Sequence, residues 1–360
     1  MLRLPLLALV LTTPWLAAAD SARASPQISL SSFVFDPRGV AAGSPAGTVV
    51  VTSVDGRSLD IQAGDYRTSF AAATSWTMRT VSFQGQVVND ARPGTFLQTV
   101  VNEKHGQTGP GKENDPFLGS GHRPETIDTL AIALYDGATH LRTISLCGPE
   151  TPGKEEKDKD GRPLTRLAAP VREEGGTTVV LRKTSRLVSA FSGHLMSLES
   201  ATVISTGGIE EYVHLTAGDG NLERIAFVHP CMFMLPLQTK SYLAFREGQP
   251  VLEGTFLTDN SMTLRKPITA LMTWMPKAKL GLALYHTSAY ANGEVLIWNR
   301  PHDHKLYFRY PFPRTAGQRM EYRLFFKAFR CQGLQAKEGS GAKPFTVPSG
   351  SATATAFLIE

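Results

Sequence analysis

The feature that most constrains the fold of this chain is a series of short segments in which apolar and polar residues alternate. Residues 127–135 (IDTLAIALY) and 140–146 (HLRTISL) are two of these segments, and Asp136-Gly137 lies between them. Side chains of a β-strand point to opposite faces in turn, so alternation is typical of a strand that is buried on one face. An Asp-Gly pair between two such runs is a strong hairpin signal. This part of the chain therefore predicts an antiparallel strand pair.

Segments of the same kind recur along the chain, separated by turn residues such as Gly207-Gly208 and Asn292-Gly293. Helical periodicity over ten or more residues is hard to find, and Ser192-Gly193 interrupts the best candidate, residues 187–198. The pattern predicts an all-β protein, a large antiparallel β-sandwich with few or no helices. The expected strands are 48–52, 59–63, 76–83, 127–135, 140–146, 177–181, 196–204, 210–215, 224–228, 280–286, 295–298, 322–329 and 356–359.

The first 24 residues have the composition of a secretory signal peptide. Arg3 precedes a short apolar run, and Ala22-Arg23-Ala24 offers a cleavage site, although cleavage after Ala19 would also fit. The apolar run is shorter than the roughly 20 residues needed to cross a bilayer, which makes a membrane anchor the weaker alternative. We therefore expect a secreted or periplasmic protein with no stable membrane insertion after cleavage.

Residues 25–360 are expected to form a single β-sandwich domain, because no linker or internal repeat divides them. Two stretches look irregular: the glycine-containing residues 102–123, and residues 148–161 with the charged run 154–160. We expect that run to be a solvated loop. The net charge of +5 is spread along the chain and forms no basic stripe, so nucleic acid is not an expected partner.

The three cysteines, Cys147, Cys231 and Cys331, are far apart in the sequence. An exported protein could join two of them in a disulfide, but their spacing gives no disulfide framework. Buried, unreactive thiols are the other interpretation. The sequence leaves both open.

The best single signal for a functional site is the segment WNRPHDHKLYF at residues 298–308. Residues two apart in an extended strand point to the same side, so His302 and His304 would share a face. Imidazole transfers protons near neutral pH and also binds metals. Zinc needs three or four ligands, and the sequence identifies no third one, so we expect neither a metal nor a cofactor. The alternative is that the histidines are loop residues bonded to the backbone.

In this segment we expect catalytic roles for His302, His304 and Tyr307, and substrate binding by Arg300 and Trp298. Aromatic rings stack on sugar rings and also fill β-cores. Trp298 and Tyr307 flank the histidines, which makes them the aromatic residues best placed to contact a ligand.

A second candidate is the segment FLGSGHRPE at residues 117–125, just before a strong strand. Its glycines allow tight turns, and His122 could do acid–base work. Arg123 and Glu125 are expected to bind substrate, since arginine offers a fixed fork of donors. The alternative is a glycine-rich turn with surface charges. His286 is added as a binding residue, because only one expected hairpin separates it from the histidine segment.

An exported all-β chain with histidine, arginine, glutamate and tyrosine on loops resembles the galactose mutarotase-like β-supersandwich superfamily. The resemblance rests on the overall pattern of strand-like segments, on His122-Arg123 and on His302–His304. It covers the chain from Ser29 to Phe329. It implies a sandwich fold and sugar chemistry with one histidine acid and a distant C-terminal glutamate base. The glutamates after the histidine segment are Glu321, Glu338 and Glu360.

The sequence thus leads to the hypothesis of an exported carbohydrate-active enzyme with a poly- or oligosaccharide ligand. A lyase would use histidine or tyrosine as base and arginine to neutralise a uronate carboxylate. A hydrolase needs two carboxylates about 5–10 Å apart, and the sequence shows no evident pair. The alternative is a non-catalytic glycan-binding or structural protein of the cell envelope. A metal-binding envelope protein is a third possibility.

Overall fold

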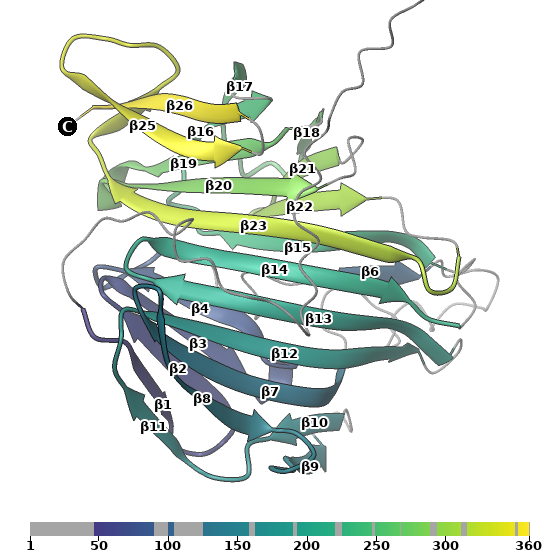
Figure 1. The fold of residues 1–360 in the computed structure, drawn as a ribbon. Helices are drawn as coiled ribbons and strands as arrows, with labels where there is room; N and C mark the ends of the chain where they lie inside the picture. The colour runs from purple at the N-terminus through teal and green to yellow at the C-terminus, as the bar shows by residue number, and fades with distance from the viewer. Residues whose placement is uncertain are drawn as a thin grey trace, which may run out of the picture. The chain divides into compact units, whose positions relative to one another are not determined.

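The computed structural model describes residues 47–89, 100–103, 125–157, 163–189, 193–219, 225–246, 249–266, 268–288, 294–310, 315–349 and 352–359. Within them the chain is built of antiparallel strands (Figure 1), and its helical elements are the single turns η3 (Ala72–Thr74) and η5 (Pro276–Ala278). The prediction of an all-β antiparallel sandwich is confirmed. No helix in this described part of the chain is long and apolar enough to cross a membrane.

The largest sheet has ten strands and contains the predicted hairpin. Residues 127–135 and 140–146 form the cores of two strands that pair across the Asp136-Gly137 turn, where Gly137 has φ of 54°. Of the one candidate helix, residues 187–189 and 193–198 are the ends of two neighbouring strands. In order, the ten strands are β17 (Gln249–Thr255), β16 (Ser241–Arg246), β19 (Ala270–Met275), β20 (Leu280–Ser288), β23 (Arg319–Arg330), β14 (Gly208–Ala217), β13 (Gly193–Ser205), β12 (Thr178–Ser189), β7 (Glu125–Asp136) and β8 (Thr139–Cys147).

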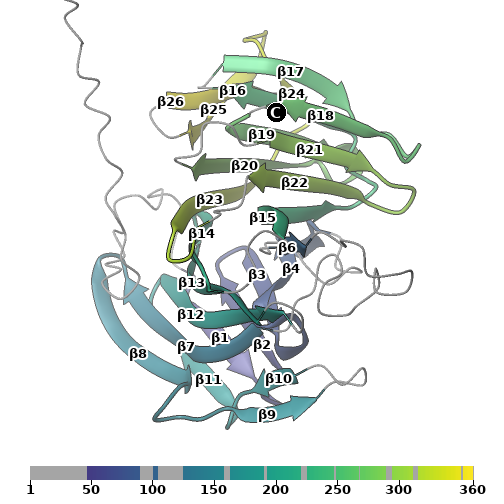
Figure 2. The same ribbon diagram turned by 90° about the vertical axis from the view of Figure 1, so that its right-hand side faces the viewer.

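Two smaller sheets lie behind the ten-stranded sheet in the view of Figure 1, and Figure 2 shows them from the side. The five-stranded sheet has the order β18 (Met262–Lys266), β21 (Glu294–Asn299), β22 (His304–Tyr310), β15 (Ile225–Leu235) and β6 (Val100–Glu103). The six-stranded sheet has the order β11 (Val171–Glu174), β1 (Val50–Ser53), β2 (Ser58–Ala63), β3 (Tyr66–Ala71), β4 (Thr77–Phe83) and β5 (Gln86–Val87).

One hydrophobic core joins the three sheets. It contains alternate residues of each, for example Ile61 of β2, Leu215 of β14 and Ile297 of β21, all fully buried. Because side chains alternate along a strand, the residues between these core positions face outwards. Each sheet therefore has an inner face in the core and an outer face that can carry polar groups.

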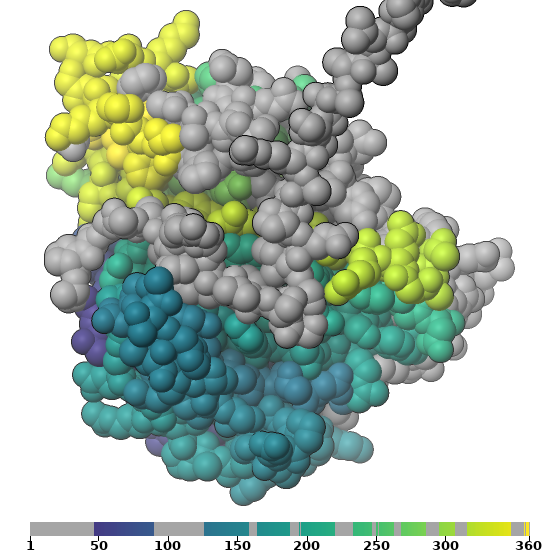
Figure 3. All heavy atoms as spheres, viewed as in Figure 1, coloured from purple at the N-terminus to yellow at the C-terminus, as the bar shows by residue number. Residues whose placement is uncertain are grey.

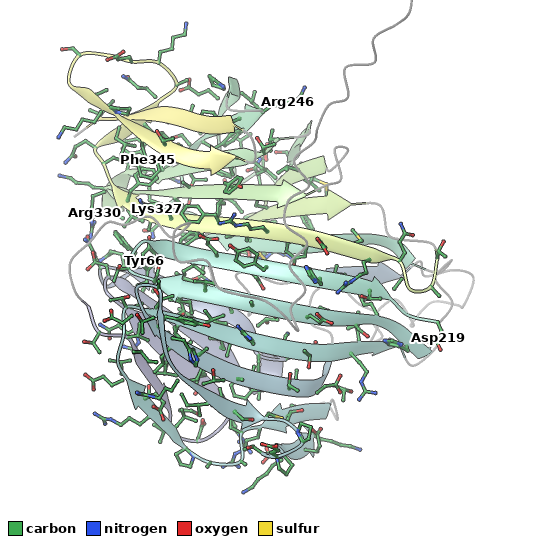
Figure 4. The ribbon with its side chains drawn as sticks, in the orientation of Figure 1. Tyr66, Asp219, Arg246, Lys327, Arg330 and Phe345 are labelled. Carbon is green, nitrogen blue, oxygen red and sulfur yellow. The ribbon has the colours of Figure 1, made fainter. Side chains whose placement is uncertain are left out.

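The C-terminal part of the chain covers one end of the outer face of the ten-stranded sheet. It forms a three-stranded sheet of β24 (Gly333–Gln335), β26 (Ala352–Ile359) and β25 (Ala342–Ser349). A second hydrophobic cluster lies beneath it, where the rings of Phe329 and Phe345 are 4.2 Å apart and Lys327 Nζ lies 5.6 Å from the Phe345 ring (Figure 4). Of these three strands, the sequence predicted only β26.

The charged run of residues 154–160 is partly ordered as a strand, so the prediction of a solvated loop is wrong for its first half. Lys154–Lys157 forms β9, which pairs with β10 (Pro163–Arg166). Glu156 accepts hydrogen bonds from Arg57 and from Arg166, and these contacts explain why a charged segment is held in place. The other stretch expected to be irregular, residues 102–123, lies outside the described residues beyond Glu103.

Two of the three cysteines, Cys147 and Cys331, are buried free thiols. Burial raises the pKa of both, to about 11 for Cys331, so both thiols stay protonated and unreactive at neutral pH. No disulfide joins them. The signal peptide expected over residues 1–24 lies outside the described residues.

Candidate functional site

The two histidines of the predicted segment do not share a face. His302 lies in a bend before β22, with its side chain 54% exposed, whereas His304 begins β22 and is 1% exposed. The strand does not continue through this segment, because Pro301 favours a turn. The backbone N–H of Arg300 donates to the carbonyl of Asp303 and closes that turn. The expectation of a shared face for His302 and His304 is therefore wrong.

His304 is instead part of the core. Its ring stacks on Phe256, with centroids 4.8 Å apart. Neither ring nitrogen makes a hydrogen bond of normal geometry within the described residues, although the backbone of Thr239 lies beside the ring. Burial, helped by the charge of Lys240, lowers the pKa of His304 to about 4, so this imidazole is neutral at neutral pH. Buried in this way, it cannot reach a polysaccharide.

The turn holds a buried ion pair that orients Arg300. Asp303 is fully buried and receives two parallel hydrogen bonds from the guanidinium, one of them from Nε to Oδ1 at 2.6 Å. Such bidentate pairs are strong and fix the plane of the arginine. The exposed His302 lies beside the same carboxylate, with 3.7 Å between Nε2 and Oδ2. Arg300, itself mostly buried, is thus held in one orientation.

Two cationic side chains lie over the ring of Trp298 on the outer face of the five-stranded sheet. The centre of the Arg300 guanidinium lies 5.5 Å from the indole centroid, and Lys305 Nζ lies 5.7 Å from it. Lys305 stands directly opposite Trp298 in the neighbouring strand. Cations at this distance are attracted by the negative face of an aromatic ring. The indole N–H donates to Asn260 Oδ1 at 2.9 Å, which fixes the ring.

The charge of Lys305 changes near neutral pH. Burial, together with the nearby Arg300 charge, lowers the pKa of Lys305 to about 8, against the opposing pull of Asp303. A lysine with a pKa near the working pH can take up and release a proton, and perturbed groups of this kind gather at functional sites. Trp298, Arg300, His302 and Lys305 are called the Trp298 site below.

The remaining predicted residues fall into two groups. His122 and Arg123 lie outside the described residues. Glu125, His286 and Tyr307 lie in β7, β20 and β22. Tyr307 is in β22, two positions from Lys305, but His286 is in β20 of the ten-stranded sheet. The expected hairpin between His286 and the histidine segment does not exist, because the chain changes sheets between β20 and β21. The roles assigned to these residues stay predictions.

A second group of polar residues, which the sequence did not reveal, lies on the outer face of the ten-stranded sheet. Glu199 of β13 and Glu321 of β23 stand directly opposite His214 of β14, one on each side. These residues and Arg319 are called the His214 cluster. The signal that could have found them is the alternation in β14, where polar residues at 210, 212 and 214 interleave with the buried Ile209, Val213 and Leu215. The pairing of distant strands was not predictable.

Next to this cluster, Glu210 is 4% exposed and binds Arg323 and Tyr212. Arg323 donates from Nε at 3.0 Å and from Nη2 at 2.5 Å, and the Tyr212 hydroxyl donates at 2.7 Å, all to Glu210 Oε2. Burial and the Glu210 charge raise the pKa of Tyr212, which keeps the hydroxyl neutral and able to donate.

Metal ligands are not gathered at either place. Among the described residues no group of three or more histidine, cysteine, aspartate or glutamate side chains is close enough to hold a metal ion.

No protein-family model matches the chain, and no curated protein sequence matches it either. Among solved structures, a galactose mutarotase-like protein from Clostridium acetobutylicum aligns with 78% of this chain and 98% of its own, at 8% identity and a TM-score of 0.34. A galactose mutarotase related enzyme from Lactobacillus acidophilus aligns over 74% and 96%, at 8% identity and a TM-score of 0.28.

A GH36 alpha-galactosidase from Geobacillus stearothermophilus aligns over 78% of this chain at 9% identity and a TM-score of 0.39, but only 41% of the galactosidase is covered. All three alignments have TM-scores below 0.4 and identities below 10%. The chemistry of the two outer faces rests on their own residues.

Proposed function

We propose that the chain is a secreted or periplasmic carbohydrate-active enzyme that acts on a uronate-containing poly- or oligosaccharide at the Trp298 site. The observation that carries the proposal is the convergence of Arg300 and Lys305 on the ring of Trp298. Export is proposed from the N-terminal sequence pattern. The alternative of a glycan-binding protein without catalysis differs in one respect, the absence of a product.

The cations of the Trp298 site suit a sugar that bears a carboxylate. Arg300 is held in place by the buried Asp303, so little side-chain entropy is lost when the guanidinium meets an anion. Neutralising a uronate carboxylate makes the proton on the adjacent carbon easier to remove. The charge of Arg300 that binds the substrate therefore also prepares it for the reaction.

Lys305 supplies the base for an elimination. Its neutral amine takes the proton from C5 of the uronate, the C4=C5 bond forms, and the C4–O glycosidic bond breaks. The leaving oxygen receives a proton from His302, which is exposed at the rim of the site. Lysine thus replaces the histidine or tyrosine base that the sequence suggested, because His304 lies in the core. A base with a pKa of about 8 is suited to work near neutral pH.

The proposal is tested by incubating the full chain with polygalacturonate and with alginate and following the ultraviolet absorbance of the new double bond. We expect Lys305→Met to lose about a hundredfold or more of the rate, as general base variants do. Lys337→Met, at an exposed position far along the chain, is the matched control. Absorbance unchanged in Lys305→Met would contradict the elimination, and saturable binding without product would favour the glycan-binding alternative.

A further inference from the structure

The turn of residues 257–261, which leads from β17 to β18, borders the Trp298 site but has no part in the elimination. Figure 3 views the molecule from the side of the ten-stranded sheet, and the five-stranded sheet lies behind it in this orientation. Met262 begins β18 and stands directly opposite Trp298, whereas Lys305 of β22 stands opposite it on the other side. The turn therefore approaches Trp298 from the side away from Lys305.

Asn299 fastens this turn to the end of β21. Its backbone N–H donates to the carbonyl of Ser261 at 2.8 Å, and its side-chain Oδ1 accepts from the backbone N–H of Leu257 at 3.1 Å. Its Nδ2 donates to Ser261 Oγ at 3.3 Å. Asn299 is fully buried, and a buried amide group is costly to leave without partners. Both ends of the turn are thus bound to the residue that follows Trp298.

Hydrogen bonds inside the turn set the backbone at Asn260. Asp259 Oδ1 accepts from the backbone N–H of Ser261 at 3.0 Å, which closes an Asx-turn. Hydrogen bonds from the side chain and the backbone of Ser261 lower the pKa of Asp259, so the accepting carboxylate is ionised at neutral pH. Asn260 has a φ of 63°, in the left-handed region that asparagine adopts more readily than most residues. The conformation of Asn260 is therefore held by contacts other than the one it makes with Trp298.

The amide oxygen of Asn260 is placed to hold the indole of Trp298. It accepts from Nε1 at 2.9 Å, and Nε1–H is the only donor of an indole. The ring that is held in this way is the one that Arg300 and Lys305 approach to 5.5 and 5.7 Å. A cation is attracted to an aromatic ring when it lies over the face of the ring, so turning the indole would weaken both contacts.

We propose that Asn260 is a positioning residue of the Trp298 site, where it keeps the indole in the place that lets Arg300 and Lys305 bind a uronate together. The proposal rests on the function proposed above and adds to it a residue that acts through the ring. Without the acceptor the indole turns, and the two cations lose the surface that gathers them. The guanidinium keeps its pair with Asp303 and the amine remains, so a sugar that does bind is still converted. Loss of the Asn260 amide should therefore raise KM and leave kcat nearly unchanged.

The contact is tested first without a substrate, by NMR of the full chain labelled with nitrogen-15. The indole resonance of Trp298 is the one that disappears in Trp298→Phe. Asn260→Gly removes the amide, and glycine adopts a positive φ without strain, so the turn keeps its backbone. We expect the Trp298 indole hydrogen to exchange with solvent about fivefold faster or more in Asn260→Gly, because it has lost its acceptor. Asn260→Asp keeps an oxygen at the same place and should exchange like the wild type.

Gln84 provides a matched control at the turn between β4 and β5. It too has a positive φ, of 48°, and its Oε1 accepts from Arg330 Nε at 2.7 Å. Figure 4 labels Arg330, at the end of β23. Gln84→Gly therefore removes an amide acceptor from the same kind of backbone position in a different part of the chain. It should leave both the exchange of the Trp298 indole hydrogen and KM unchanged.

The consequence for the site is measured as KM and kcat for polygalacturonate or alginate. We expect Asn260→Gly to raise KM about fivefold and to change kcat by less than about twofold, because binding is weakened and the reacting groups remain. Trp298→Phe removes the indole donor, so adding Asn260→Gly to it should raise KM no further. Asn260→Asp should have a KM near that of the wild type.

Exchange of the Trp298 indole hydrogen at the wild-type rate in Asn260→Gly would overturn the inference, as would an equal change in Gln84→Gly. A fall in kcat with KM unchanged, or a KM for Asn260→Asp as high as that for Asn260→Gly, would also contradict it. Absence of the double bond from both polymers would contradict the elimination and not the contact, which the exchange measurement decides without a substrate. The failure of one proposal is therefore distinguishable from the failure of the other.

Discussion

The two outer faces of this sandwich share one core, yet their polar groups are assembled in different ways. At the Trp298 site the side chains come from a stretch of eight consecutive residues, 298–305, that turns at Pro301 and is fastened by Asp303. In the His214 cluster they come from three strands whose residues are up to 122 positions apart in sequence, at 199, 214 and 321. The first place is cationic and organised around an aromatic ring, whereas the second pairs carboxylates with an imidazole. Local sequence therefore defines the first face, and strand register defines the second.

The largest expected effect concerns the carboxylate that fastens the Trp298 site. Asp303→Asn removes the charge that compensates Arg300, which is only 15% exposed. Breaking a buried ion pair from one side costs about 3–5 kcal/mol, so the free energy of unfolding should fall by that amount in urea titrations. Glu173→Gln, which breaks an exposed pair with Arg142, should cost under about 1 kcal/mol. Equal losses in the two variants would show that the turn is not held by this pair.

Acid should lower the free energy of unfolding through His304, which follows Asp303 in the same segment. Its pKa is about 4 in the folded chain, below the 6.5 that is ordinary for a histidine, so the unfolded state gains a proton first as the pH falls. Stability is thus fully present above pH 6.5 and is lost towards pH 4, by about 3 kcal/mol at pH 4. The measurement compares the free energy of unfolding at pH 7 and pH 4 in the wild type and in His304→Leu. If the variant shows the same pH dependence as the wild type, His304 is not the group responsible.

On the other face, the matching change is smaller, because its ion pair is more open to solvent. Glu210→Gln weakens the charged hydrogen bonds from Arg323 and Tyr212, and we expect a loss of about 1.5–3 kcal/mol in the same titration. Asp128→Asn, whose partner Arg186 is 53% exposed, is the control and should cost under about 1 kcal/mol. A loss for Glu210→Gln as large as that for Asp303→Asn would remove the difference between the two faces.

The sequence predicted the fold class and many of the strands, because alternation reports burial on one face whatever the strand pairs with. The turn at Asp136-Gly137 could be predicted for a similar reason, since the glycine adopts a positive φ. Strand β9 was missed because its charges look like those of a solvated loop, and its order comes from Arg57, about a hundred positions away. The sequence also could not show which strands share a sheet. For this reason His286 was wrongly expected to lie one hairpin away from the histidine segment.

The candidate site was predicted in part. Trp298 and Arg300 are near each other in sequence and meet in space, and the cluster around them was expected. The shared face of His302 and His304 was wrong, since the pattern could not show that Asp303 would turn inwards to Arg300. Lys305 was overlooked because an alternating strand gives no sign that a lysine is half-buried beside another cation. The His214 cluster required knowledge of the register of three strands.

The central claim is that the cations on Trp298 form the working site of a uronate-specific enzyme, with Lys305 as its base. The most direct measurement is the pH dependence of the rate of double-bond formation from polygalacturonate or alginate. The account predicts a rate that rises with pH through a midpoint near 8, the pKa of Lys305. In Lys305→Met this rise should be absent. A rate that keeps the same midpoint in Lys305→Met, or no double bond from either polymer at any pH, would contradict it.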